Sequence, residues 1–154
     1  MQNEIPNLDA FKNAFKELKK SKAWRGSIDE RKAKFKTAHD TLNQTYGRDL
    51  KLLFVDVSAE FDAVQGASGF SGYSEQLNAI VIVHKLSVIT FMQLWLIALG
   101  IEQISAVEFS KNLFNEIFPR SAKNLVMING LLVKADASAN NDASNDNIND
   151  LNGQ

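Results

Sequence analysis

The sequence predicts a small α+β domain, and three observations support that fold class. Amphipathic helical patterns fill the first 47 residues, short β-branched runs follow, and helical periodicity then returns. The chain has 154 residues, of which 45% are hydrophobic. This length is enough for one domain with a buried core and too short for two such domains. We expect one domain over residues 1–134, with a basic helical part (1–47) and a sheet with further helices (48–134).

Two helices are expected in the basic part. The first, over residues 9–20, carries apolar residues at helical spacing on one face: Phe11, Phe15 and Leu18. Ser27 stands three residues before Glu30, the spacing of a capping box, which predicts the start of a second helix. That helix should run to Tyr46, because Gly47 follows as a stop signal.

The middle of the chain changes to extended patterns. Residues 50–58 and 78–84 are short apolar runs rich in β-branched residues, which are typical of buried strands. A segment rich in Gly and Ser, residues 65–76, separates them and is expected to form turns. Two strands joined in this way indicate a small sheet.

Further helices are expected after the sheet. Residues 86–101 form sixteen consecutive residues without a charge. They fall short of the roughly 20 needed to span a bilayer, so we expect a buried helix and no membrane association. A further helix is expected over residues 105–118, before Pro119. The apolar stretch 122–134 fits either a helix or a strand.

The last segment, residues 135–154, consists mostly of Asn, Asp, Ser and Ala. It has too little apolar surface to offset the entropy of ordering, so we predict a disordered tail. The first residues lack the apolar core and the small-residue cleavage site of a signal peptide. The chain has no cysteine, which fits a reducing compartment, and we expect a cytoplasmic protein.

Charge is distributed unevenly along the chain. Residues 1–51 carry twelve Lys or Arg against seven Asp or Glu, whereas the rest carries five against eleven. A basic front end permits contact with nucleic acid or an acidic partner. Acidic residues are interspersed and no nucleic-acid motif is present, which favours solvated helix faces. Nucleic-acid binding stays open as an alternative.

Two phrases resemble a known family. "KLSVITF" (85–91) and "FSKNLF…FPRS" (109–121) are similar to segments of the small zincin-like metallopeptidase domains of bacterial phages and other mobile elements, of the ImmA/IrrE type. The resemblance covers roughly residues 50–125. It implies a zincin-like fold in which the helix after "KLSVITF" would carry an HExxH motif, with two zinc-binding histidines and a general-base glutamate.

The positions that this resemblance assigns to zinc chemistry hold other residues here. Gln93 and Ile97 stand where the two histidines would be, Leu94 replaces the glutamate, and Ser105 takes the place of the third ligand. Leu94 and Ile97 have no donor atom, and a neutral amide or hydroxyl is a weak zinc ligand. We therefore expect no metal cofactor and no catalysis, with zinc present only in active relatives.

The resulting expectation is a catalytically inactive zincin-like domain, a pseudo-metallopeptidase with a structural or binding role. The apolar helix either fills the core or presents a hydrophobic surface to an unknown protein partner, and Trp95 would anchor such a surface. His84 is a weak candidate for a base or an orienting residue. Two alternatives remain: a zinc-dependent hydrolase whose site lies elsewhere, and a nucleic-acid-binding accessory protein of a mobile element.

Overall fold

The computed structural model describes residues 5–55, 72–83, 88–120, 125–128 and 130–134. These residues form helices and small sheets, which confirms the predicted α+β class. The elements in chain order are α1 (Leu8–Ser21), α2 (Ile28–Tyr46), β1 (Lys51–Val55), β2 (Gly72–Ser74), β3 (Ala79–Val83), α4 (Val88–Ala98), α5 (Gln103–Ile117), β4 (Leu125–Ile128) and β5 (Leu131–Lys134).

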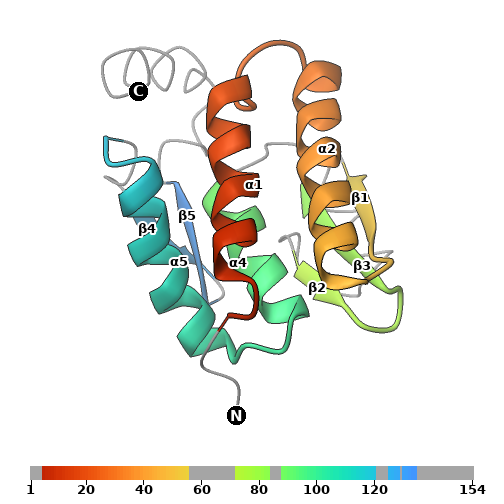
Figure 1. The fold of residues 1–154 in the computed structure, drawn as a ribbon, viewed down its shortest axis with the longest axis vertical. Coiled ribbons are helices and arrows are strands. Elements are labelled where there is room, and N and C mark those ends of the chain that lie inside the picture. The colour runs from red at the N-terminus through yellow and green to blue at the C-terminus, as the bar shows by residue number, and fades with distance from the viewer. Residues whose placement is uncertain (1–4, 56–71, 84–87, 121–124, 129, 135–154) are drawn as a thin grey trace.

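The two N-terminal helices form as predicted, and they lie side by side in Figure 1. The apolar face of α1 is buried. At the start of α2 the Ser27 hydroxyl accepts from the Glu30 amide at 3.1 Å, and the Glu30 carboxylate accepts from the Ser27 amide at 2.7 Å. The predicted capping box is therefore confirmed. The helix ends at Tyr46, and Gly47 follows as its C-cap, with a φ of 60° in the left-handed region that glycine tolerates.

The three-stranded sheet has the order β1-β3-β2. Its central strand, β3, pairs in parallel with β1 and antiparallel with β2. Residues 79–82 of β3 are at most 1% exposed, as expected for a strand covered on both faces. The prediction of turns was wrong for Gly72–Ser74, because pairing with β3 makes this short segment a strand.

Within the stretch left open between helix and strand, residues 125–128 and 131–134 are two paired strands. β4 and β5 pair antiparallel, and the register places Ile128 opposite Leu131. The two intervening residues in the sequence are Asn129 and Gly130, and the φ of Gly130 is 82°. Asn-Gly favours the two-residue turns of hairpins, because both positions need positive φ.

The core is built around α4, which lies behind α1 in Figure 1 and packs against α5, β2, β3 and β5. The ring of Phe91 on α4 lies 5.8 Å from Phe15 of α1 and 5.2 Å from Phe35 of α2. No helix in the described ranges is long and apolar enough to cross a membrane. The tail predicted for residues 135–154 lies outside the described residues.

The capping box gives a test of how the start of α2 is stabilised. Ser27→Ala removes the oxygen that accepts from the Glu30 amide, and should lower the free energy of unfolding by about 1 kcal/mol in urea denaturation. Ser27→Thr keeps an oxygen at the same place and should lose much less. Equal stability of Ser27→Ala and the parent chain would show that this cap does not stabilise α2.

Candidate functional site

The candidate site lies on α4, which is enclosed on all sides. Every residue from Val88 to Ala98 is buried except Ile97, which is half-buried. The helix carries no charge, and apolar side chains occur around its whole circumference. A helix that is hydrophobic all round is a core helix in a domain of this kind. Its polar groups must find partners inside the protein.

Gln93 is the fully buried polar side chain at the centre of this helix, with 0% exposure. Its amide pairs with the backbone of β5. The Oε1 atom accepts from the Leu132 amide at 2.8 Å, and Nε2 donates to the Leu132 carbonyl at 2.8 Å. Nε2 also donates to the Ile89 carbonyl at 3.0 Å. The Gln93 side chain therefore pairs with Leu132 as the backbone of a neighbouring strand would.

Thr90, one turn before Gln93 on α4, also bonds to β5. Its hydroxyl donates to the Leu132 carbonyl at 3.2 Å, so that carbonyl accepts from two side chains of α4. The amide oxygen and the amide nitrogen of Gln93 both have hydrogen-bond partners, as is usual for a buried polar side chain. β5 thus covers the side of α4 that carries Thr90 and Gln93.

The other positions that the resemblance singles out are also accounted for. Leu94 is 1% exposed and belongs to the hydrophobic core, and half-buried Ile97 packs against it. Ser105 lies half-buried on α5, the helix that packs against α4. Within the described residues no three His, Asp or Glu side chains are close enough together to hold a metal ion.

Trp95 is a core residue in this structure. Its exposure is 0%, so it presents no surface to a partner, and of the two readings of α4 the geometry favours core filling. The indole N–H donates to Nδ1 of His39 on α2 at 3.0 Å. The ring centroids of Trp95 and His39 lie 5.2 Å apart. Burial of a tryptophan is favourable when its N–H finds a partner, as it does here.

His39 is a buried histidine that the sequence pattern did not single out as a candidate. It is 2% exposed, and its Nε2 lies 2.8 Å from the Leu50 carbonyl. Because Nδ1 accepts from Trp95, Nε2 must carry the proton and donate to Leu50, which fixes the neutral tautomer. Burial lowers the pKa of His39, and the Leu50 carbonyl opposes that shift. The available signal was its position at i+4 from Phe35 on α2.

Asn43 completes this polar cluster one turn after His39. Its amide donates to the Leu50 carbonyl at 2.9 Å and accepts from the Leu50 amide at 3.0 Å. Leu50 precedes β1, so the cluster fixes the chain where it enters the sheet. Both ring nitrogens of His39 are used in buried hydrogen bonds, an arrangement that orders the core and is not suited to proton transfer. His84, the weak candidate for a base, lies outside the described residues.

The comparisons with known proteins assign no family. No family model matches the chain, no curated protein matches its sequence, and no solved structure matches its fold.

Gln93 gives a direct test of the contact with β5. Gln93→Leu keeps the volume similar but leaves the buried Leu132 amide without a partner, which should cost about 2–3 kcal/mol of unfolding free energy. The matched control is Gln103→Leu, which removes an exposed hydrogen bond to Gly130 and should cost about 0.5 kcal/mol or less. Urea denaturation measures both. Similar losses for the two variants would contradict the structural role of Gln93.

The neutral state of His39 predicts a pH dependence. A histidine whose folded pKa is lowered contributes full stability above its unfolded pKa of about 6.5, and stability falls as the pH drops below that value. The free energy of unfolding should therefore decline between about pH 6.5 and pH 5, before carboxylates titrate. His39→Gln, which leaves His84 in place, should flatten this decline. An unchanged slope would assign it to other groups.

Proposed function

We propose that the chain is a non-catalytic zincin-like domain with a structural or binding role. The observation that supports this most is the state of Gln93. At the position that the resemblance assigns to the first zinc ligand, the side chain is fully buried and both ends of its amide are bonded to Leu132. The resemblance implies a helix after "KLSVITF", and α4 occupies that place in the chain.

The chemistry of the replaced residues supports the same proposal. A catalytic zinc ion needs three protein ligands and an open position for water. Leu94 and Ile97 offer no donor atom and belong to or pack against the core. A general base must reach a water molecule that attacks the substrate, and leucine at the position of the glutamate cannot accept a proton.

A binding role would use the outside of the domain. Among the described residues, the exposed large apolar side chains are Ile104, Val126 and Met127, on α5 and β4. Single exposed apolar residues are common on protein surfaces. A protein partner that makes apolar contacts would meet these three side chains and not Trp95, which is buried. We place the domain in the cytoplasm, since a cysteine-free composition fits a reducing compartment.

Restoring the missing ligands tests the zincin-like assignment. The variant Gln93→His, Leu94→Glu, Ile97→His and Ser105→Glu should gain zinc affinity, measured by titration with a competing chelator, while the parent chain binds substoichiometric zinc. A matched control keeps three of the changes but leaves Ile97, and should bind far more weakly because one ligand is absent. Chemical denaturation of both variants checks that they fold.

Two results would contradict the proposal in different ways. A restored variant that folds and binds zinc no better than its control would show that α4 is not a former zinc helix. Near-stoichiometric zinc in the purified parent chain would show that the domain still holds a metal.

A further inference from the structure

β4 is the outer strand of the pair that it forms with β5. Among the described residues it pairs with β5 alone, and it lies behind α5 in the view of Figure 1. On β5, Leu131 and Leu132 are buried, with 8% and 7% exposure. On β4, Val126 is 40% exposed and Met127 is 55% exposed. The pair is therefore buried at its inner strand and open at its outer one.

The contact between β5 and Gln93 shows which backbone groups of β4 face outward. Gln93 bonds to the amide and the carbonyl of Leu132, so both of these groups point away from β4. Leu132 lies opposite Met127 in the register. In an antiparallel ladder, the members of such a pair exchange no hydrogen bonds and direct their backbone groups to opposite sides. Met127 thus presents its N–H and C=O at the outer edge, and Leu125, two positions earlier, does the same.

The side chains of β4 add an apolar surface to this edge. In the described part of the chain three large apolar side chains are exposed, and two of them, Val126 and Met127, belong to β4. The sequence of the strand, Leu125–Ile128, contains no charged residue and no proline. Charged residues and prolines are common means by which an edge strand avoids pairing with another strand. The edge of β4 is therefore suited to the addition of a strand.

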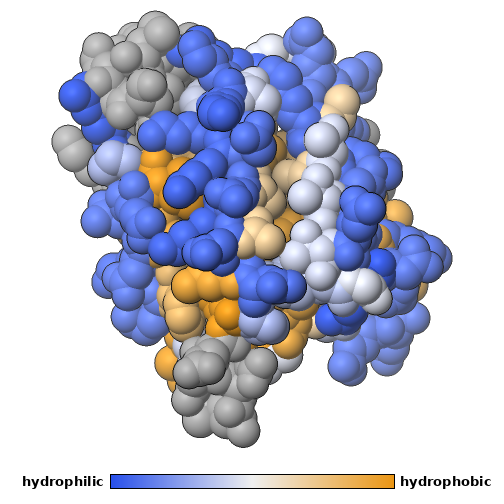
Figure 2. All heavy atoms as spheres, viewed as in Figure 1, coloured by the Kyte–Doolittle hydropathy of each residue, from blue (hydrophilic) through white to orange (hydrophobic). Residues whose placement is uncertain are grey.

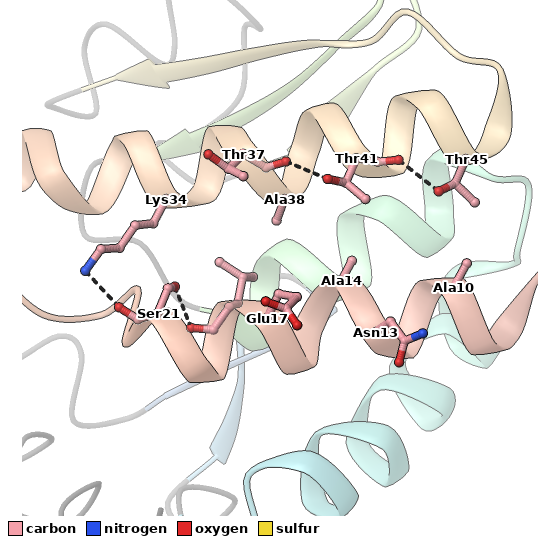
Figure 3. A pocket seen from close by; sticks show the side chains of 11 residues that line it. Ala10, Asn13, Ala14, Glu17, Ser21, Lys34, Thr37, Ala38, Thr41 and Thr45 are labelled. Carbon is pink, nitrogen blue, oxygen red and sulfur yellow. Dashed lines mark hydrogen bonds between the residues drawn. The ribbon is translucent and has the colours of Figure 1, made fainter.

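Other surfaces of the described structure are less suited to a strand. β1 begins with the charged Lys51, and β2 is a three-residue strand that begins with Gly72. Hydrophilic side chains prevail along α1 in Figure 2, and the crease between α1 and α2 contains Glu17 and Lys34 (Figure 3). Backbone groups inside a helix are already bonded within that helix. A strand would therefore find both backbone partners and exposed apolar side chains at β4.

We propose that the occupant of this edge is β4 of a second copy of the chain, so that the two strand pairs join into one antiparallel sheet. β4 is complementary to itself in one register. Val126 lies opposite Val126 of the second copy, on the two-fold axis, and Leu125 lies opposite Met127 of the second copy. The outward-facing amides and carbonyls of Leu125 and Met127 then all have partners across the interface.

The composition of β4 favours a second copy as its partner. A strand without charge meets no like-charge repulsion when it pairs with itself, and β-branched residues such as valine pair well across strands. A two-stranded ribbon also gains stability when it becomes part of a wider sheet. Antiparallel pairing about a two-fold axis closes at a dimer, because it gives each β4 a neighbour on both sides.

Sedimentation equilibrium of the full-length chain tests the proposal. The paired segment is short beside a standard interface of about 1,600 Å², so we expect a reversible dimer with a dissociation constant of about 10 µM to 1 mM. Met127→Pro removes an N–H that faces the second copy and leaves the bonds to β5 in place. It should weaken the dimer by about tenfold or more. Met127→Leu keeps that N–H and should dimerise like the parent, and urea denaturation checks that both variants fold.

A charge on the two-fold axis gives a second variant that does not depend on proline. Val126→Lys places two like charges directly opposite each other and should abolish the dimer. The matched control is Gln44→Lys, which adds the same charge at an exposed position of α2, a helix that packs against α1 and β1. This control should dimerise like the parent.

Introduced cysteines report the register, because the chain has none of its own. Val126→Cys should form an interchain disulfide under mild oxidation, since residues in such a pair lie about 4.5 Å apart between Cα atoms, within the range that a disulfide spans. Leu125→Cys and Met127→Cys should link slowly when alone and readily when mixed, because these two positions face each other across the interface.

Three results would each overturn the proposal. The first is a parent chain that stays monomeric up to about 1 mM. The second is a dimer that persists in both Met127→Pro and Val126→Lys. The third is a Val126→Cys variant that links no faster than Gln44→Cys. The pairing of β4 does not rest on the zincin-like assignment, which zinc titration tests separately, so either can fail without the other.

Discussion

The enclosure of α4 is the constraint on which the described structure depends. A helix without water on any side must pair each of its polar side chains with another part of the protein, because an unpaired buried donor or acceptor costs about 1–3 kcal/mol. Gln93 and Thr90 bond to β5, and Trp95 bonds to His39 of α2. These bonds fix where the C-terminal hairpin and the N-terminal helices sit relative to the core.

Two amide side chains act as substitutes for a neighbouring strand. Gln93 binds both the amide and the carbonyl of Leu132, and Asn43 does the same for Leu50. Each satisfies a backbone segment where the small sheets provide no partner, which is needed when the segment is buried. The bonds of Gln93 place β5 over one side of α4. The polar group of Gln93 is therefore used in hydrogen bonds that hold β5 against α4.

Local signals in the sequence predicted the local features. The spacing of Phe11 and Phe15, and of Ser27 and Glu30, predicted α1 and the start of α2, because both depend on residues within two turns. The strand at Gly72–Ser74 was missed because its pairing with β3, and not its own composition, makes it extended.

The polar contacts of α4 could not be predicted from the sequence, because they also depend on distant parts of the chain. Gln93 meets a residue 39 positions away and Trp95 meets one 56 positions away. No local pattern marks such pairs. The expectation that Gln93, Leu94, Ile97 and Ser105 hold no zinc depends only on residue type and on the resemblance, and it stays a prediction. The contact between β5 and Gln93 could not be predicted from the sequence.

Hydrogen exchange tests the closed state of α4 most directly. The Leu132 amide donates to Gln93, and the Trp95 indole N–H donates to His39. Both donors are buried. Such groups exchange only when the core opens. Both groups should therefore exchange at the rate of global unfolding. Exchange of either group at the rate of exposed helix ends would contradict this expectation, because it would show that this core is open to water.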